Sequence, residues 1–307
     1  MNTDIPLTNL HTHTFRCKHA SGTVDEYCAE AVKQGIRILG FSDHSPFPDG
    51  RNGSSRMEFS ELPDYVRDVR EAKRKFPQLT ILLGSEIDFF EDLGVAYYED
   101  LFFGEYRFDY LIGGVHWISN EQDYHNADGT LTLEGVRRYM KCAIRLMETG
   151  LIRYLAHPDL TAFRTPFWTP EIAALYREVM EASASLGVPV EINAYGMRKP
   201  RTLLPDGSTR MMYPWDPVWE LAAECGVKAV AGSDAHRPQD VRGNIGDCFR
   251  FAEKHGLAIH NYDVAREILA SPGMLKKIDF LKNGATLSER QVKYPELTVY
   301  ETQNHQQ

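Results

Sequence analysis

The sequence has few cysteines and lacks any long run of apolar residues. Its 307 residues include five cysteines, which are scattered and never form a Cys-x-x-Cys pair. This pattern argues against a disulfide framework and against a zinc ribbon. No run of about eighteen apolar residues occurs, and the N-terminus carries neither a basic segment nor an apolar signal core. We therefore expect a cytoplasmic protein that does not enter a membrane.

The sequence also lacks a basic cluster interleaved with aromatic residues. Lys and Arg number 34 against 43 Asp and Glu, which gives a formal net charge of -9. This balance argues against a nucleic-acid groove, so we expect no nucleic-acid partner. A linker rich in Gly, Pro or Ser is missing as well. We therefore expect a single domain over residues 1–307, with a flexible tail at 299–307.

The sequence does contain a repeated phrase: a helix end, a Gly, a short β-branched run and then polar residues. The Gly suits the left-handed position that ends a helix, and the apolar run has the length of a buried parallel strand. Three further strand-like runs, at 7–13, 79–89 and 108–118, bring the expected strands to seven. The repeated phrase occurs in QGIRILGFSDHS, TGLIRYLAHPDL, LGVPVEINAYG and CGVKAVAGSDAH.

Segments with helical character separate these strands. Thr23 and Glu26 form a capping-box pattern, and Thr169 followed by Pro170 is typical of a helix start. Strand alternating with helix indicates βα units around a parallel sheet, and we expect an α/β fold that closes, or nearly closes, into a barrel. The long stretches 45–60 and 196–214 each follow a strand and should lie over the functional face. The expected helices are 23–35, 61–76, 131–149, 169–187, 215–225 and 239–256.

Each expected strand ends in metal-capable side chains. His11 and His13 are two residues apart, so an extended chain points both to the same face, and the same spacing relates Asp234 and His236. One histidine alone would be weak evidence. Seven of the eleven histidines, however, fall at strand ends or in the first loop, which predicts a metal centre. In chain order the candidates are His11, His13, His19, Asp43, His44, Glu86, His116, His157, Glu191, Asn193, Asp234 and His236.

Other residues of the same types are not expected to bind metal. Cys17 is interpreted as a loop residue, because a thiolate is unusual among so many carboxylates and imidazoles. Glu191 is expected to support the site. The remaining histidines lie in polar loops, at a helix end or in the tail: His125, His255, His260 and His305.

In this order the motifs HTH, SDH, SE, GVH, AHPD and GSDAH resemble the polymerase and histidinol phosphatase (PHP) family over roughly residues 7–250. The resemblance implies a distorted (β/α)7 barrel, similar to a TIM barrel, with its active site at the C-terminal ends of the strands. It also implies three divalent metal ions, of Mn, Fe or Zn. The implied ligands are His11, His13, Glu86 and Asp234 for the first metal, Glu86 as a bridge with His116 and His157 for the second, and His19, His44 and His236 for the third.

The phrases SDHSPFP, NAYGMRKP and GSDAH resemble the histidinol-phosphatase branch of that family. The branch implies hydrolysis of L-histidinol phosphate, a small phosphate monoester, in histidine biosynthesis, with a hydroxide bridging two metals as the nucleophile. Asp43, where some members carry Glu, is the candidate for proton transfer to the leaving oxygen or for orienting the nucleophile. Its alternative role is that of a partner that orients His44 or another ligand histidine. Arg164 and Arg198 resemble positions that contact phosphate, with Lys199 and Arg201 as nearby substitutes.

Three other functions stay open. The same metal chemistry could act on another small phosphate ester, a nucleotide or nucleic-acid ends, although the acidic charge counts against the last. A non-catalytic metal-binding barrel is disfavoured by the complete ligand set. An amidohydrolase also begins with a His-x-His strand, but those barrels usually have eight strands and often a bridging lysine, and no expected strand here ends in lysine.

Overall fold

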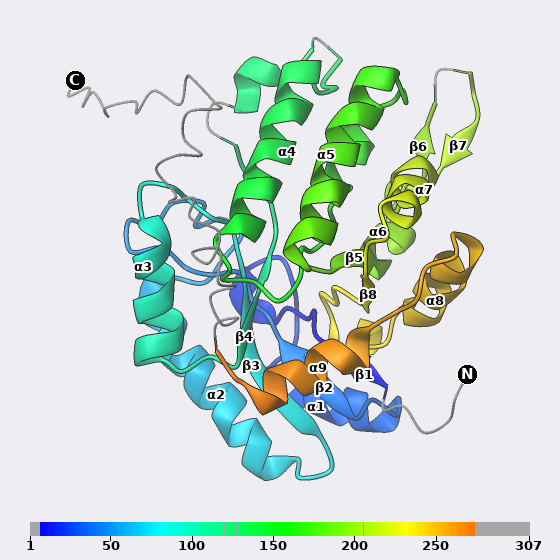
Figure 1. The fold of residues 1–307 in the computed structure, drawn as a ribbon. Coiled ribbons are helices and arrows are strands. Elements are labelled where there is room, and N and C mark those ends of the chain that lie inside the picture. The colour runs from blue at the N-terminus through cyan, green and yellow to red at the C-terminus, as the bar shows by residue number, and fades with distance from the viewer. Residues whose placement is uncertain (1–6, 119–120, 127, 205, 274–307) are drawn as a thin grey trace, which may run out of the picture. The chain divides into compact units, whose positions relative to one another are not determined.

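Four parallel strands form the main sheet of the computed structural model, in the order β1-β2-β3-β4 (Figure 1). They are β1 (Thr8–Asn9), β2 (Ile38–Phe41), β3 (Thr80–Ile87) and β4 (Tyr110–Gly113). The structure describes residues 7–118, 121–126, 128–204 and 206–273. The tail predicted at 299–307 lies outside these residues, so the single-domain prediction stays a prediction.

Two further strands, β5 (Val190–Asn193) and β8 (Ala229–Gly232), pair with each other in parallel. Beyond the ends of β1 and β8, Thr12 and Ala235 form an isolated parallel bridge. The order of parallel strands and helices confirms the α/β class, and the main sheet is curled. The loop after β5 holds a small antiparallel pair that the sequence did not predict, β6 (Thr202–Leu203) with β7 (Thr209–Arg210).

The segment expected as the fifth strand is much shorter than predicted. Leu155 alone forms parallel bridges, to Gly113 of β4 and to Val190 of β5. The backbone then leaves the extended form at His157, where φ is +28°. A regular ladder needs extended residues in succession, so this segment lies between its neighbours without forming a strand.

The helices occupy the segments predicted for them. Thr23 caps α1 with the predicted capping box, and Thr169 caps α5 by accepting a hydrogen bond from the backbone of Ile172. In Figure 1, α4 and α5 lie side by side. The predicted helices are α1 (Val24–Lys33), α2 (Leu62–Lys75), α4 (Leu133–Glu148), α5 (Pro170–Leu186), α7 (Asp216–Glu224) and α8 (Ile245–Lys254).

Several short elements were not predicted. A π-helix at Glu99–Glu105 continues α3 (Gly94–Tyr98), and α6 (Ala194–Arg198) follows β5 directly. The helix α9 (Asn261–Ala270) was not predicted either. Single 3-10 turns lie at Phe15–Cys17, Phe59–Glu61, Glu121–Tyr124, Leu160–Arg164 and Pro238–Asp240.

The helix α9 packs against the inner side of the strands, where Figure 1 shows it crossing β1 and β2. Asn261 donates hydrogen bonds to the carbonyls of Thr8 (3.0 Å) and Ala231 (2.7 Å). A separate buried cluster joins this helix to the inward side chains of the strands, and so gives the inner side of the sheet a core of its own. The cluster contains Leu10, Ile38, Leu82, Tyr110, Ile112, Tyr154, Ala156, Val230, Val264, Ala265 and Ile268.

Tyr110 fills the space that two glycines leave open. Its hydroxyl donates to the carbonyl of Leu10 at 2.7 Å. A Cβ at Gly40 would lie 2.1 Å from this hydroxyl, and a Cβ at Gly84 would lie 2.4 Å from the ring. The glycines of the motifs ILGF and LLGS are therefore needed for packing rather than for backbone flexibility.

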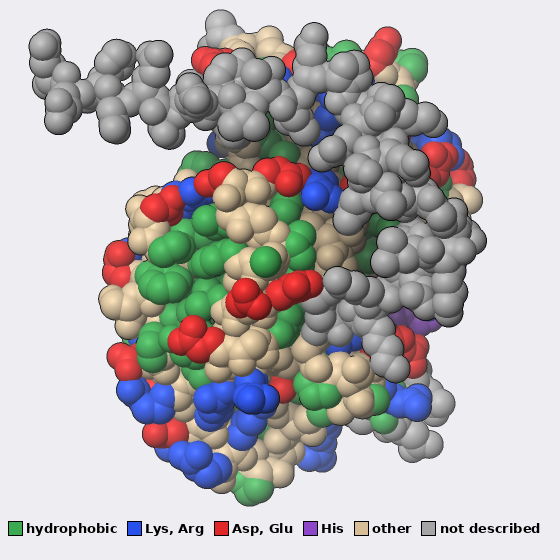
Figure 2. Space-filling model, turned by 60° about the vertical axis from the view of Figure 1, so that its left-hand side comes forward, with side chains coloured by type: hydrophobic (Ala, Val, Ile, Leu, Met, Phe, Trp, Pro, Cys, Tyr) green, Lys and Arg blue, Asp and Glu red, His purple; other side chains and the backbone are tan. Residues whose placement is uncertain are grey.

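The surface carries both signs of charge. On the face shown in Figure 2, acidic side chains border an area of hydrophobic ones, and Lys and Arg side chains gather below it. On α2, Arg67 pairs with Asp64 and Asp68, so part of the basic charge of this helix is balanced by its own acidic residues. In the part of the chain that the structure describes, no helix is both long and apolar enough to span a membrane.

Candidate metal centre

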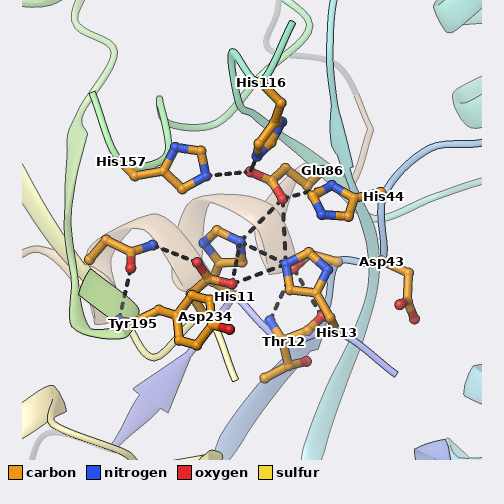
Figure 3. Close-up of polar contacts among 12 residues, drawn as sticks. His11, Thr12, His13, Asp43, His44, Glu86, His116, His157, Tyr195 and Asp234 are labelled. Atoms are coloured by element: carbon orange, nitrogen blue, oxygen red, sulfur yellow. Dashed lines mark hydrogen bonds and ion pairs between the residues drawn. The ribbon is translucent and has the colours of Figure 1, made fainter. Parts of the chain in front are cut away.

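The nine predicted ligand residues come together beyond the C-terminal ends of the strands. Figure 3 shows seven of them, all except His19 and His236. Of the nine, six are buried, His116 and His236 are half-buried, and His19 is exposed. Parallel strands end at one edge of a sheet, which is why residues far apart in the sequence meet here. That they bind metals stays a prediction.

Glu86, at the end of β3, lies at the middle of the cluster. Its Oε1 lies 2.9 Å from His157 Nε2 and 3.5 Å from His116 Nε2. Its Oε2 is buried and lies 3.1 Å from His44 Nδ1, but it accepts no hydrogen bond of good geometry from the described residues. A carboxylate with imidazoles facing both oxygens is suited to bridge two cations.

Asp234 lies on the other side of His11 and His13. Its Oδ1 is 3.2 Å from His13 Nε2 and 3.5 Å from His11 Nε2, and it too is buried without a hydrogen-bond partner. The two imidazole Nε2 atoms are 3.1 Å apart. Buried polar atoms without partners are rare in folded proteins, and a bound cation would satisfy them.

In four of the histidines Nδ1 faces an oxygen atom of the protein, so that Nε2 is the atom that could bind a metal ion. Nδ1 of His11 lies 2.7 Å from Glu191 Oε1, and Nδ1 of His116 lies 3.3 Å from both oxygens of Asp88. Because these oxygens accept, each Nδ1 carries the hydrogen and each Nε2 presents a lone pair. Two further Nδ1 atoms face backbone carbonyls: that of His19 faces Cys17 at 2.7 Å, and that of His236 faces Asp234 at 3.1 Å.

The ionisation of the metal-free cluster is divided. Burial would lower the pKa of His11 and His116, but the nearby carboxylates outweigh it, so the pKa of His11 is raised well above its usual value and that of His116 to about 9. Three other groups already have the form that metal ligation requires. Burial lowers the pKa of His44 well below its usual value and the pKa of His236 to about 3, so both imidazoles are neutral. Burial alone would raise the pKa of Glu86, but the neighbouring histidines His116, His44 and His11 outweigh it and hold this pKa well below the usual range. Neutral imidazoles and ionised carboxylates are the forms that bind metals.

Two of the predicted ligands have strained backbones. His157 has φ +28° and Asp234 has φ +47°, in the left-handed region that non-glycine residues seldom adopt. Such conformations persist where the surrounding structure enforces them, and they cluster at functional sites.

The donor set fits a centre with several metals. In each of three groups, the potential ligand atoms lie within 4.8 Å of one another. Imidazole and carboxylate ligands suit Mn, Fe and Zn. The groups are His19, His44 and His236; His11, His13 and Asp234; and His11, Glu86 and His157. The first is the complete set predicted for the third metal.

Asp43 is buried, and its carboxylate points away from the histidines (Figure 3). Its Oδ1 accepts from the backbone N–H of Thr14 at 2.8 Å, and its Oδ2 accepts from the hydroxyl of Thr14 at 2.7 Å. Burial raises the pKa of Asp43. In this arrangement Asp43 holds the loop after His13, which favours the orienting alternative over proton transfer.

The two predicted phosphate contacts have other partners in the structure. Arg164 Nη1 lies 3.1 Å from His125 Nε2. Arg198 donates to the carbonyls of Ser233 (2.6 Å), Asp234 (3.2 Å) and Gly243 (2.9 Å). Arg198 therefore supports the strained end of β8. Of the two substitutes, Lys199 Nζ lies 3.8 Å above the Tyr195 ring, and Arg201 bonds Thr209.

The remaining histidines and Cys17 are placed as follows. His255 contacts Asp216 at 2.9 Å and His260 contacts Asp263 at 3.0 Å, while His305 lies outside the described residues. Cys17 is buried, and its sulfur belongs to a further group of potential ligand atoms with His13 and His236. Burial raises the pKa of the Cys17 thiol well above its usual value, which keeps it protonated and disfavours it as a ligand.

Glu191 has the supporting part expected of it. Besides its contact with His11, its Oε2 accepts from the backbone N–H of His157 (3.2 Å) and from the amide of Asn193 (2.8 Å). One carboxylate thus holds two predicted ligands.

Sequence reasoning missed Asp88 and Arg56. Asp88 accepts from the backbone N–H of His116 at 2.8 Å, and Arg56 pairs with Asp88 at 3.0 Å. Asp88 follows Glu86 by two residues, the same spacing as His11 and His13, and this signal could have revealed it. Nothing in the sequence distinguishes Arg56 from other loop arginines.

A curled parallel sheet whose strand ends gather histidines and carboxylates defines a metal-dependent hydrolase of the α/β class. The chain belongs to the PHP domain family, whose profile matches residues 9–195. It is 31% identical over 257 residues to a probable histidinol-phosphatase of Deinococcus radiodurans, covering 80% of this chain and 90% of that one. The family prediction is confirmed, and with it the hydrolase class.

Two further comparisons agree. A probable histidinol-phosphatase of Schizosaccharomyces pombe is 24% identical over 282 residues, covering 82% of this chain and 88% of that one. The histidinol phosphate phosphatase of Lactococcus lactis was solved with zinc, L-histidinol and phosphate. Its structure matches 82% of this chain and 95% of its own, at a TM-score of 0.65 and 18% identity, and it supports the fold.

Proposed function

We propose that this chain is a metal-dependent phosphomonoesterase that hydrolyses L-histidinol phosphate to L-histidinol and phosphate, a step of histidine biosynthesis. The observation that carries the proposal is the cluster of nine ligand-type side chains, in which one oxygen each of Glu86 and Asp234 is buried with no hydrogen bond among the described residues. The names of the relatives point to this substrate, and the Lactococcus lactis enzyme was solved with both products. A cytoplasmic location, as predicted from the sequence, belongs to this proposal.

The proposal includes a trinuclear centre and a full (β/α)7 barrel. His11, His13, Glu86 and Asp234 would hold the first metal, Glu86, His116 and His157 the second, and His19, His44 and His236 the third. When bound, divalent metals offset the charge of the phosphate and activate the attacking water. The bridges of Leu155 to both neighbouring strands, and of Thr12 to Ala235, support closure of the barrel.

The chain's own residues would prepare the site for this chemistry. Glu191 and Asp88 orient His11 and His116, so that their Nε2 lone pairs face the centre. Arg164 and Arg198 are proposed to contact the phosphate, for which a guanidinium offers two parallel N–H donors. In Arg198→Met we expect the KM to rise roughly tenfold. An unchanged KM with a lowered metal content would instead assign Arg198 to holding Asp234.

Asp43 is proposed either to transfer a proton to the leaving oxygen or to orient a ligand histidine. Asp43→Asn separates the two, because Asn keeps the shape but cannot carry a proton and donate it to the leaving oxygen. Retained metal with turnover lowered by about two orders of magnitude or more supports proton transfer, whereas lost metal supports orientation.

The proposed function is tested by steady-state hydrolysis with metal-replete protein. L-histidinol phosphate is compared with AMP, glycerol phosphate and p-nitrophenyl phosphate. We expect kcat/KM above roughly 10⁴ per molar per second, about a hundredfold above the other substrates. Slow and equal hydrolysis of all four would contradict the substrate and favour another small phosphate ester or nucleotide.

A pair of matched variants tests the metal centre. In His157→Gln we expect activity to fall by about two orders of magnitude or more, because a proposed ligand is lost. In His255→Gln, whose histidine contacts Asp216 instead, activity should stay at the wild-type level. Equal activity in both variants would overturn the role of the centre.

A further inference from the structure

We propose that Arg56, in the loop after β2, is a positioning residue that fixes two ligand histidines of the centre at once. It would act on His116 through Asp88 and on His44 through the Ser45 carbonyl. The inference deepens the proposed function and rests on its claim that the centre binds divalent metals.

Arg56 is held as a buried cation with every guanidinium nitrogen paired. Its side chain is 2% exposed. Nη2 donates to Asp88 Oδ2 at 3.0 Å, Nη1 to the carbonyl of Ser45 at 2.7 Å, and Nε to the carbonyl of Asn52 at 3.3 Å. Burying a charge is unfavourable unless it is paired and hydrogen-bonded, so these contacts define one conformation.

The contact with Asp88 leads to His116. Asp88 is 3% exposed, and its Oδ1 accepts from the backbone N–H of His116 at 2.8 Å. Both of its oxygens lie 3.3 Å from His116 Nδ1, which therefore carries the hydrogen. The Nε2 lone pair then faces Glu86 Oε1, at 3.5 Å. Arg56 offsets the charge of Asp88 and keeps the carboxylate in place, so it would set both the tautomer and the direction of His116.

The contact with Ser45 leads to His44. Ser45 follows His44 directly, and its backbone N–H donates to the carbonyl of Glu86 at 2.9 Å while its own carbonyl accepts from Arg56. The backbone of Ser45 is thus held by hydrogen bonds on both sides. His44 Nδ1 lies 3.1 Å from Glu86 Oε2 on the ordered segment that results. Since His116 and His44 are proposed for different metals, loss of Arg56 should weaken two positions and spare the pair of His11 and His13.

The same loop offers a matched control. Arg51 donates to both oxygens of Asp92, at 2.9 and 2.6 Å, and also to Asp49. Like Arg56 it ties the loop to the segment after β3. Its hydrogen bonds among the described residues go to these aspartates and not to the groups that hold His44 and His116. Arg51→Lys therefore perturbs the loop without perturbing the proposed relay, which consists of the contacts of Arg56 with Asp88 and with the Ser45 carbonyl.

The experiment measures metal affinity directly. The full chain is stripped with a chelator and titrated with Zn²⁺ against a chromophoric competitor, and the bound metal is counted by mass spectrometry. For Arg56→Lys we expect two of the three proposed ions to bind about 10–100-fold more weakly, because both His116 and His44 lose support. For Asp88→Asn, which acts on His116 alone, we expect one ion to bind more weakly and the others to be unchanged. Arg51→Lys should match the wild type. Circular dichroism and melting of the metal-free variants establish that they fold. Should Arg56→Lys fail to fold, Asp88→Asn tests the relay with Arg56 intact.

Two results would overturn the inference: wild-type affinities in Asp88→Asn, or an equal loss in Arg51→Lys, which would make it a general effect of the loop. Because binding is measured without substrate, the two proposals fail separately. A wild type that binds Zn²⁺ but does not hydrolyse L-histidinol phosphate overturns the proposed substrate and leaves the relay intact. If the wild type hydrolyses L-histidinol phosphate but Arg56→Lys and Asp88→Asn bind Zn²⁺ as the wild type does, only the relay is overturned.

Discussion

Glu86→Gln is expected to abolish the stabilisation of the fold by metal. Gln preserves the volume of this buried side chain, but it removes the charge and replaces one acceptor oxygen with an NH₂ group that cannot bind a cation. The substitution therefore alters the ligand shared by two proposed metals with little change in packing. Imidazole nitrogens lie within 3.5 Å of its oxygens in His11, His13, His44, His116 and His157.

The size of the effect follows from linkage between binding and folding. Residues that only orient a ligand are worth about 10–100-fold in metal affinity, so we expect a bridging ligand to be worth roughly a thousandfold, or about 4 kcal/mol. With metal at 100 times the wild-type Kd, the wild type gains about 2.7 kcal/mol. The same metal concentration is only about a tenth of the variant's Kd, so metal binding stabilises the variant by roughly 0.1 kcal/mol or less. For a chain of 307 residues, with an unfolding entropy of roughly 2.1 cal/mol/K per residue, the difference corresponds to about 4 °C in Tm.

The assay is thermal unfolding of each protein with metal and with chelator. Comparing the two conditions within one variant cancels any effect of the substitution on the metal-free fold. Glu224→Gln is the control, because Glu224 is exposed on α7 and pairs only with Arg177 among the described residues. If Glu86→Gln keeps the wild-type shift in Tm, Glu86 is not a shared ligand and the proposed arrangement is wrong.

Three further predictions concern the fold. Gly84→Ala should cost about 1–3 kcal/mol of unfolding free energy in urea, since its Cβ would lie 2.4 Å from the Tyr110 ring; an unchanged midpoint would refute this packing argument. Thr169→Ala should cost about 1 kcal/mol in the same assay, because it removes the N-cap of α5, and a neutral result would show that the cap is dispensable. Burial raises the pKa of Asp216, but hydrogen bonds from Lys254 and His255 outweigh it and lower the pKa below 3.8. The stability lost in Asp216→Asn should therefore be seen at neutral pH and shrink as the pH falls below about 4, whereas a constant difference would exclude the charge as its cause.

The predictable part of the structure depends on local signals. The six predicted helices all form, because their caps and their apolar spacing lie within the helix itself, as Thr23 with Glu26 and Thr169 with Pro170 illustrate. The helix predicted over 239–256 begins later than expected, at Ile245. The cluster could be predicted because each expected strand ends in predicted ligand residues. The C-terminal ends of neighbouring parallel strands lie at the same edge of the sheet, so the predicted ligands lie close together. The family profile then confirmed which chemistry the motifs belong to.

The missed elements depend on contacts between distant segments. The helix α9 owes its place to the inner core and to Asn261, which bonds Thr8 some 253 positions away. The prediction of a full fifth strand was wrong because the backbone leaves the extended form at His157. The apolar residues beside His157 give no sign of this turn. Arg56 contacts backbone carbonyls and Asp88, and a backbone carbonyl has no signature in a sequence.

A spacing of two residues has a different structural meaning in the two pairs of predicted ligands. His11 and His13 lie beyond β1, but the chain there is still paired: Thr12 bridges Ala235, and His13 donates its backbone N–H to the Ala235 carbonyl at 2.9 Å. The alternation of an extended chain therefore does bring both imidazoles to one side, as the sequence predicts.

Asp234 and His236 have the same spacing without that alternation. The φ of +47° at Asp234 interrupts the extended chain, and His236 turns so that its Nδ1 faces the Asp234 carbonyl at 3.1 Å. A left-handed aspartate is unfavourable by itself, so it needs support from outside the pair. Arg198 provides it by donating to the carbonyls of Ser233 and Asp234. Sequence spacing therefore explains the pair His11 and His13, which an extended chain brings to one side. The pair Asp234 and His236 depends on a strained residue and on the distant Arg198, which the spacing does not indicate.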